Sequence, residues 1–193
     1  AVSPVPFLTK SIFEEVKQNI IESTIKGLSA DKIEYVGFIF FGLILTKKGV
    51  QVIEYNCRMG DPETEAVLPR IQEDILLVLK EAATKKIISR TLRVKKQTAL
   101  TVMKVSGGYP KKYPKGLIIN GIERNKNNDC IVFQAGTKIE GNKLITNGGR
   151  VLCVTGLDIN PLNARKKAYD LLRTIKFEGE YYRHDIGNDL GIN

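Results

Sequence analysis

The sequence predicts an α+β protein built from two successive parts. In the first part, two β-rich runs flank the short glycine loop Lys47-Lys48-Gly49, and helical patterns precede and follow them. In the second part, short strand candidates are separated by glycine turns, and a single helical segment follows. We therefore expect a hairpin-plus-helices unit over residues 1–96 and a mainly antiparallel β unit with one helix over residues 97–193.

The first helix is predicted over about residues 12–28. Ser11-Ile12-Phe13-Glu14 has the form of a capping box, in which a hydroxyl and a carboxylate pair with the free N–H groups at a helix start. Apolar residues then recur at roughly helical spacing. They are Phe13, Val16, Ile20 and Leu28.

Helical structure is expected again after the hairpin. Asp61 stands where an N-cap belongs, and Pro62 fits the first helical position because the N–H that proline lacks is unpaired there anyway. This helix should be broken or bent near Pro69 and resume over about residues 73–83.

The second part is predicted to consist of short strands and a closing helix. Asn160-Pro161 should begin that helix, which carries Leu162, Tyr169, Leu172 and Ile175 at apolar positions. Four runs before it read as strands bounded by glycine turns. They are ALTVMKVSGGYP, CIVFQAGTKI, NKLITNGG and RVLCVTGL.

Length and composition bound the class of protein. With 193 residues and 42% hydrophobic content, the chain can bury a core as one large domain or two small ones. The longest apolar run, Tyr35–Leu45, is too short for a membrane span, which takes about 20 residues. The opening AVSPVPFLTK holds two prolines and no initiator Met, so we expect no signal peptide and a start inside a longer protein.

The cysteine and histidine content excludes several kinds of chemistry. Cys57, Cys130 and Cys153 are far apart and form no C-x-x-C pair, which is typical of buried thiols in a reducing compartment, here the cytoplasm. His184 is the only histidine, and no nucleophile-elbow pattern accompanies it. We therefore expect no Ser-His-Asp triad.

The formal charge of +9 raises the possibility of a nucleic-acid partner. No aromatic-basic RNA-binding signature accompanies the charge, and a basic surface serves small anionic substrates equally well. We therefore expect no nucleic acid. Much of the charge lies in scattered lysines and in a basic linker, Lys85, Lys86, Arg90, Arg93, Lys95 and Lys96.

The run VIEYNCRMGDPETE places polar residues at alternate positions of a predicted strand. Side chains on a strand alternate between its two faces, so Glu54, Asn56 and Arg58 should share one face. Two oxygen ligands beside a fixed cation suit a divalent metal and the phosphate oxygens that the metal neutralises. The alternative from this run alone is a solvated edge strand whose charges have no function.

The stretch GFIFFGLILTKKGVQVIEYNCRMGDPETE resembles the end of the ATP-grasp domain in the phosphoribosylamine–glycine ligase family, also called glycinamide ribonucleotide synthetases. The resemblance implies the C-terminal part of an ATP-grasp domain, an antiparallel sheet with helices, over residues 1–96, followed by the family's C-terminal domain over residues 97–193. Five later stretches resemble that C-terminal domain in the same order. They are SGGYPKKYPKG, FQAGTK, TNGGRVLCVTGL, AYDLL and YYRHDIG.

The resemblance implies an ATP-dependent ligase of purine biosynthesis. ATP, glycine and 5-phosphoribosylamine become glycinamide ribonucleotide, ADP and phosphate, through transfer of the γ-phosphoryl group to glycine and attack of the amine on the glycyl phosphate. By the same resemblance, Glu54 and Asn56 are ligands of Mg²⁺ or Mn²⁺ bound with ATP. Residues 36–46 contain no carboxylate, so phosphates and water should complete the metal shell.

The resemblance also implies roles for residues outside the metal pair, each with a structural alternative. Arg58 should hold the acyl phosphate with its planar fork, or else pair structurally with Asp61 or Glu63. Asp61 should pair with the ammonium group of glycine, or else serve only as a helix cap.

The glycine turn and two arginines of the second part are implied to form the substrate cleft. Gly148, Gly149, Arg150 and Arg183 should lie near the ribose phosphate. The alternative is a plain hairpin turn at Gly148–Gly149, a surface charge at Arg150 and a docking strand at YYRHDIG.

Two rival functions remain at this stage: another ATP-grasp carboxylate–amine ligase, and a non-catalytic basic domain that binds RNA or acidic proteins. In the favoured case, the lobe with the adenine pocket belongs to an N-terminal part of the same enzyme that these residues do not include. We therefore expect the isolated chain to fold, to form its own cores and to be inactive alone.

Overall fold

The computed structural model describes residues 1–87, 91–125 and 128–192. The chain forms two compact units. Unit 1 comprises Ala1–Pro4, Pro62–Arg70 and Lys95–Asn193, and unit 2 comprises Val5–Asp61 and Ile71–Val94. Each unit therefore draws on both sides of residue 62, and we keep a domain boundary near residue 96 as a proposal.

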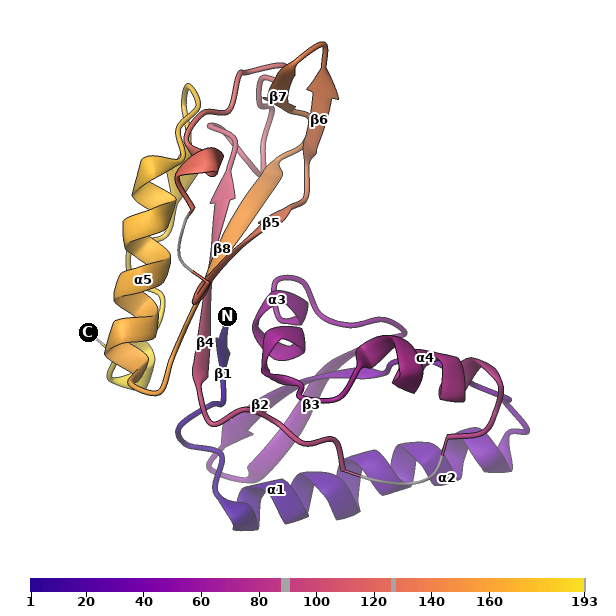
Figure 1. Ribbon diagram of the computed structural model, residues 1–193. Coiled ribbons are helices and arrows are strands. Elements are labelled where there is room, and N and C mark those ends of the chain that lie inside the picture. Colours follow the sequence, from indigo (N-terminus) through magenta and orange to yellow (C-terminus); the bar gives the residue numbers. More distant parts are fainter. Residues whose placement is uncertain (88–90, 126–127, 193) are drawn as a thin grey trace. The chain divides into compact units, whose positions relative to one another are not determined.

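Unit 1 is built on an antiparallel five-stranded sheet with the order β1-β4-β8-β5, in which β9 also pairs with β4 (Figure 1). The short strands β1 and β9 pair with opposite ends of β4, at Ala99–Leu100 and at Lys104–Val105. Strands β4, β5 and β8 confirm three of the predicted runs, although the strand predicted over CIVFQAGTKI ends at Gln134. The bounds of the five strands are β1 Val2–Ser3, β4 Thr98–Val105, β5 Cys130–Gln134, β8 Arg150–Asp158 and β9 Tyr181–Tyr182.

Helix α5 (Pro161–Thr174) packs on this sheet and confirms the predicted closing helix. The side chain of Asn160 caps it by accepting a hydrogen bond from the Leu162 N–H at 2.9 Å. Gly156 on β8 permits close contact, because a Cβ there would lie 2.2 Å from the Ala164 carbonyl oxygen. The core between sheet and helix includes Leu100, Val102, Leu152, Val154, Ala164, Ala168, Leu172 and Ile175.

Two smaller elements complete unit 1. Strands β6 (Thr137–Glu140) and β7 (Lys143–Thr146) form a separate two-stranded ribbon. Helix α3 (Thr64–Val67) continues into a 3₁₀ turn, Leu68–Arg70, and is tied to β8 by a hydrogen bond from the Thr155 hydroxyl to the Glu65 carbonyl.

The predicted start of the helix after the hairpin was wrong. Residues 61–63 form a turn, and the N-cap of α3 is Glu63. Asp61 and Pro62 therefore do not occupy the N-cap and the first helical position of α3. The predicted break near Pro69 is confirmed, because helical structure resumes as α4 (Ile75–Ala83), capped by the side chain of Asp74.

Unit 2 holds one long helical segment and the predicted hairpin. The segment runs through α1 (Lys10–Val16), a π-helical stretch (Lys17–Ile21) and α2 (Glu22–Ala30). The predicted capping box was wrong, because the Thr9 hydroxyl makes the capping bond. The hairpin is confirmed, with β2 Phe40–Thr46 and β3 Gly49–Asn56.

Unit 2 has little buried apolar surface. Among the residues that the structure describes, its buried hydrophobic side chains are Val16 and Ile20, and both core clusters of the chain lie in unit 1. The chain thus forms cores of its own, and among the described residues they lie in unit 1 rather than in unit 2. Many of its large apolar side chains are exposed, including Phe7, Phe13, Ile25, Val36, Phe38, Ile53, Tyr55, Leu76 and Leu77.

Two further observations concern the class of protein. Over the described parts of the chain, no helix combines the length and apolar character that crossing a membrane requires. Cys57, Cys130 and Cys153 are free thiols, of which Cys57 is exposed and the other two are buried. The prediction that all three are buried is therefore wrong for Cys57.

Candidate functional site

The C-terminal end of β3 brings Glu54 and Asn56 together. The Asn56 Nδ2 group donates a hydrogen bond to Glu54 Oε1 at 3.0 Å. Glu54 is exposed and Asn56 is partly buried. This bond occupies neither Glu54 Oε2 nor Asn56 Oδ1, so it orients two oxygen atoms of the kind that Mg²⁺ and Mn²⁺ prefer.

Gly42 on β2 makes room for the Glu54 side chain. The two residues face each other across the hairpin, and a Cβ on Gly42 would lie 2.7 Å from Glu54 Cγ. The ladder is irregular at the next position: Leu43 pairs with Val52, so Ile53 is an extra residue on β3. A bulge of this kind bends a strand and re-aims the adjacent side chain, here Glu54.

The structure does not place Arg58 on the same strand face as Glu54 and Asn56. Strand β3 ends at Asn56, and Arg58 lies in the bend that follows. Its guanidinium donates to the Met59 carbonyl oxygen at 2.8 Å. The prediction that Arg58 shares a strand face with Glu54 and Asn56 is thus wrong. Asp61 lies in the turn that follows, at residues 61–63.

In the described parts of the chain, no group of three His, Cys, Asp or Glu side chains could hold a metal ion. The fit to a divalent metal therefore rests on the carboxylate–amide pair Glu54–Asn56 alone. Both donors are oxygen atoms, which suits Mg²⁺, an ion that commonly takes one or two protein ligands and fills its shell with phosphate and water oxygens.

A second group of candidate residues surrounds a cavity in unit 1. The cavity has a volume of about 440 Å³, and both Arg150, at the start of β8, and Arg183, just after β9, line it. The structure thus brings together two of the predicted substrate residues. Met103, Val105, Tyr109 and Tyr182 contribute to the wall.

The Gly148–Gly149 turn is held beside this cavity by Ser106. The Ser106 backbone N–H donates to the Gly149 carbonyl at 2.7 Å, and the Ser106 hydroxyl donates to the Gly148 carbonyl at 2.8 Å. A Cβ on Gly149 would lie 2.2 Å from Cδ2 of Tyr109. Glycine is therefore required for the cavity-lining ring of Tyr109 to pack on this backbone.

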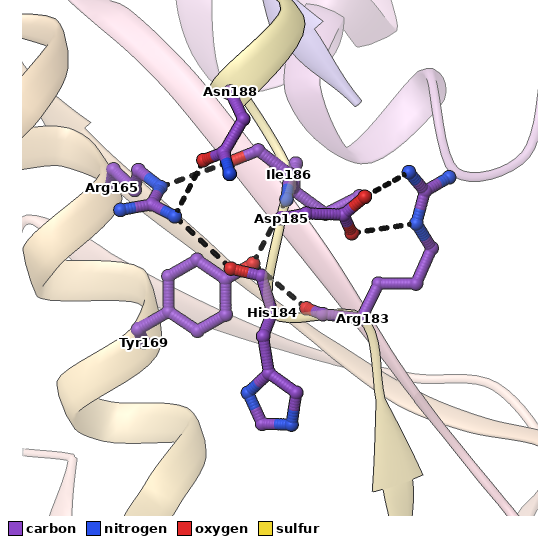
Figure 2. A network of polar contacts seen from close by, with 7 residues as sticks. All are labelled: Arg165, Tyr169, Arg183, His184, Asp185, Ile186 and Asn188. Carbon is purple, nitrogen blue, oxygen red and sulfur yellow. Dashed lines mark hydrogen bonds and ion pairs between the residues drawn. The ribbon is translucent and has the colours of Figure 1, made fainter. Parts of the chain in front are cut away.

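Arg183 is held in place by its own loop and by α5 (Figure 2). Its guanidinium makes a two-pronged ion pair with Asp185, at 2.9 and 2.7 Å, and this pair lowers the pKa of the Asp185 carboxyl. The Tyr169 hydroxyl donates to the Arg183 carbonyl and accepts from the Ile186 N–H. Arg183 is thus pre-oriented, although its side chain is 65% exposed.

Arg165 fixes the rest of the loop that follows β9. Its guanidinium donates to the carbonyls of His184 and Ile186 and to the side chain of Asn188, as Figure 2 shows. The segment YYRHDIG is therefore bonded to α5 through side chains as well as paired with β4.

Sequence reasoning missed Gly42, Ser106, Tyr109 and Arg165, and it assigned Tyr169 only to the apolar positions of a helix. A glycine inside the apolar run FFGLIL was the available signal for Gly42, because glycine within a strand often marks a bulge or a close approach. Nothing local marks Arg165, which reads as one more basic residue of a helix.

Two family models match the chain. The model described as "Phosphoribosylglycinamide synthetase, ATP-grasp (A) domain" matches residues 1–64, and "Phosphoribosylglycinamide synthetase, C domain" matches residues 99–189. Glu54 and Asn56 lie in the first match, and Arg150 and Arg183 lie in the second.

Individual proteins give the same result over nearly the whole chain. A phosphoribosylamine–glycine ligase of Fusobacterium nucleatum is 43% identical over 96% of this chain. The trifunctional purine biosynthetic protein adenosine-3 of Gallus gallus is 38% identical over 97% of it. The crystal structure of a phosphoribosylamine–glycine ligase from Thermotoga maritima superposes with a TM-score of 0.81 at 31% identity, over 96% of this chain and 45% of that one.

The chain spans only part of these longer relatives. It covers 44% of the Fusobacterium nucleatum protein and 19% of the Gallus gallus protein.

Proposed function

We propose, from the premise that the chain belongs to the phosphoribosylglycinamide synthetase family, that it is the C-terminal part of a phosphoribosylamine–glycine ligase. The reaction joins glycine to 5-phosphoribosylamine at the expense of ATP, in purine biosynthesis. The γ-phosphoryl group passes to the glycine carboxylate, and the amine then attacks the carbonyl carbon and expels phosphate. The products are glycinamide ribonucleotide, ADP and phosphate.

Glu54 and Asn56 would hold a divalent cation, Mg²⁺ or Mn²⁺, in this enzyme. The bound ion would supply charge neutralisation to the phosphate oxygens of ATP. The chain's own contribution is to fix the two oxygen donors, through the hydrogen bond between them and the space that Gly42 leaves. Phosphoryl transfer depends on such positioning more than on a covalent nucleophile.

The remaining residues would bind the substrates. Arg58, at the end of the same hairpin, would contact the acyl phosphate, and Asp61 would pair with the ammonium group of glycine. Arg150 and Arg183 would bind the ribose phosphate, with the turn Gly148–Gly149 beside them. What supports this last assignment is that Arg150 and Arg183 line one cavity.

The observation that carries the proposal is the hydrogen-bonded pair Glu54–Asn56, because it lies within the residues matched to the family's ATP-grasp domain. We further propose a cytoplasmic location, which the free state of the three cysteines supports.

A chimeric enzyme tests this function directly. The matching C-terminal part of the Fusobacterium nucleatum ligase is replaced by this chain, and release of ADP is followed with Mg-ATP, glycine and freshly generated 5-phosphoribosylamine. We expect ADP release that requires both glycine and the amine. A Glu54→Gln chimera, which keeps the size of the side chain and loses its charge, should lose most of that turnover while remaining folded.

Three outcomes would contradict the proposal. A folded chimera without glycine-dependent ADP release would reject the ligase function. Turnover with a different carboxylate and amine pair would identify another ATP-grasp ligase. Salt-sensitive RNA binding that persists in the Glu54→Gln protein would instead favour a basic binding domain. The isolated chain serves as the control, and we expect it to be inactive.

A further inference from the structure

Lys104 is a fully buried lysine in the middle of unit 1, with 0% of its side chain exposed. It lies on β4 between Met103 and Val105, both of which line the cavity of Arg150 and Arg183. Lysine is almost never fully buried unless it is paired. Its presence directly behind the cavity wall therefore requires an explanation.

The ammonium group of Lys104 has three hydrogen-bond donors, and the structure supplies three acceptors. Two are carbonyl oxygens at the C-terminal end of α5, from Leu172 at 2.9 Å and from Ile175. The third is Glu180 Oε1 at 2.9 Å. The C-terminal end of a helix carries partial negative charge, so both the carboxylate and the helix end stabilise the cation.

The same group connects α5 to the segment that leads into β9. Glu180 Oε1 also accepts from Lys176, and Glu180 Oε2 accepts from the Phe177 N–H at 3.0 Å. The Lys104 ammonium lies 5.1 Å from the ring centre of Tyr182, whose backbone pairs with Lys104 across β4 and β9. Tyr182 itself lines the cavity.

We propose that Lys104 is a positioning residue for this cavity: by joining α5, Glu180 and Tyr182, it fixes β9 and thereby holds Arg183 at the cavity wall for a phosphate-bearing ligand. The identity of the ligand, a ribose phosphate, rests on the proposed function above. The positioning itself rests only on the contacts within unit 1.

Amide hydrogen exchange in the full 193-residue chain tests the positioning without any ligand. In Lys104→Met, the amides of residues 181–185 should exchange about tenfold faster or more, while those of β8 keep their protection. The matched control is Lys167→Met, which removes another lysine of unit 1 that is paired with two carboxylates, Asp129 and Asp158. It should leave residues 181–185 unchanged.

A spectroscopic signature and a titration complete the test. The NMR signal of the Arg183 Nε–H, fixed in the wild type by Asp185, should shift and broaden in Lys104→Met but not in Lys167→Met. The affinity for ribose 5-phosphate should fall about tenfold or more in the same variant. Unchanged protection of residues 181–185 together with an unchanged Arg183 signal would overturn the inference.

Glu180→Gln is the second variant, for the case that Lys104→Met fails to fold. In this variant the Lys104 ammonium group keeps its hydrogen bonds to the α5 carbonyls and loses its ion pair with residue 180. The amides of residues 181–185 should therefore again lose protection from exchange selectively. Equal loss of protection over all of unit 1 would overturn the positioning role. If wild-type protein did not bind ribose 5-phosphate, the proposed substrate site would be rejected, and the exchange data would still decide the role of Lys104.

Discussion

The Tyr169 hydroxyl and the Arg183 backbone are joined by a hydrogen bond of 2.8 Å, which connects the middle of α5 to the wall of the cavity. The same oxygen accepts from the Ile186 N–H at 3.2 Å, so one hydroxyl satisfies two backbone groups of the loop. Burial raises the pKa of this hydroxyl, which is therefore protonated at neutral pH and able to donate.

Tyr169→Phe should destabilise unit 1 by about 1–3 kcal/mol, because the Arg183 carbonyl and the Ile186 N–H lose their partner while the ring remains in place. Urea unfolding measures the difference. Tyr181→Phe is the control, since that side chain is more than half exposed and its loss should be nearly neutral. Equal stability of the two variants would show that the hydroxyl does not hold the loop.

Gly42→Ala should impair the proposed metal site at Glu54 and Asn56, although residue 42 supplies no ligand atom. The new Cβ would lie 2.7 Å from Glu54 Cγ, so the carboxylate must move. Changes that disturb the orientation of a metal ligand cost about 10–100-fold in metal affinity or activity. The affinity for Mn²⁺ and the turnover of the chimera measure this loss.

The control for Gly42→Ala is Gln51→Ala on the same hairpin, whose exposed side chain bonds only to the neighbouring Val50 carbonyl among the contacts that the structure gives. It should keep wild-type turnover. Normal Mn²⁺ affinity in Gly42→Ala would mean that Glu54 is not constrained by its neighbour.

Gly156→Ala should destabilise unit 1 by about 1–3 kcal/mol or more, because its Cβ would lie 2.2 Å from the backbone of α5 at Ala164. Backbone cannot move aside as a flexible side chain can, so α5 must shift away from β8. Gly27→Ala in α2 should instead stabilise the protein by about 0.4–1 kcal/mol, since the new Cβ would contact nothing within 4 Å. Thermal unfolding measures both changes: the unfolding temperature should fall in Gly156→Ala and rise in Gly27→Ala.

Stability should fall in acid partly because of Glu180. Burial raises the pKa of this carboxyl, but hydrogen bonds from Lys104, Lys176 and the Phe177 N–H outweigh burial and lower the pKa below the ordinary 4.5. The unfolded chain then binds the proton more readily than the folded chain does. Glu180 therefore contributes to the free energy of unfolding above about pH 4.5, and this contribution is lost as the pH falls through the lower pKa of the folded state.

Urea unfolding at neutral pH and at pH values below 4.5 measures this effect. Wild-type protein should lose more stability between the two conditions than Glu180→Gln, which has no carboxyl to protonate at this position. A loss of the same size in both proteins would assign the acid sensitivity to other groups.

Patterns within a single element were sufficient to predict much of the fold. Asn160-Pro161 predicted the start of α5, and the Lys47-Lys48-Gly49 loop predicted the hairpin, because caps and turns depend on adjacent residues. The cap at Asp61 was wrong for a physical reason. The turn 61–63 precedes α3, and the Thr155 hydroxyl of β8 ties Glu65 to the sheet of unit 1, a constraint that no local pattern contains.

The candidate site was predictable only in part, for a similar reason. Alternation along β3 predicted that Glu54 and Asn56 lie together, but it could not show that the strand ends before Arg58. The bulge at Ile53 and the space that Gly42 leaves for Glu54 depend on the register between β2 and β3. The loop that carries Arg183 is held by hydrogen bonds from Tyr169 and Arg165, which lie on a helix distant in the sequence.

The pairing of β1 with β4 also constrains how the chain can be made. Val2 pairs with Leu100, so a strand at the start of the described chain cannot join its sheet until almost a hundred further residues have been synthesised. At about 5–20 residues per second, the ribosome would leave β1 without its partner for roughly 5–20 s. The strand β1 should therefore be able to pair with β4 before β8 and β9, the other partners of β4, have been synthesised.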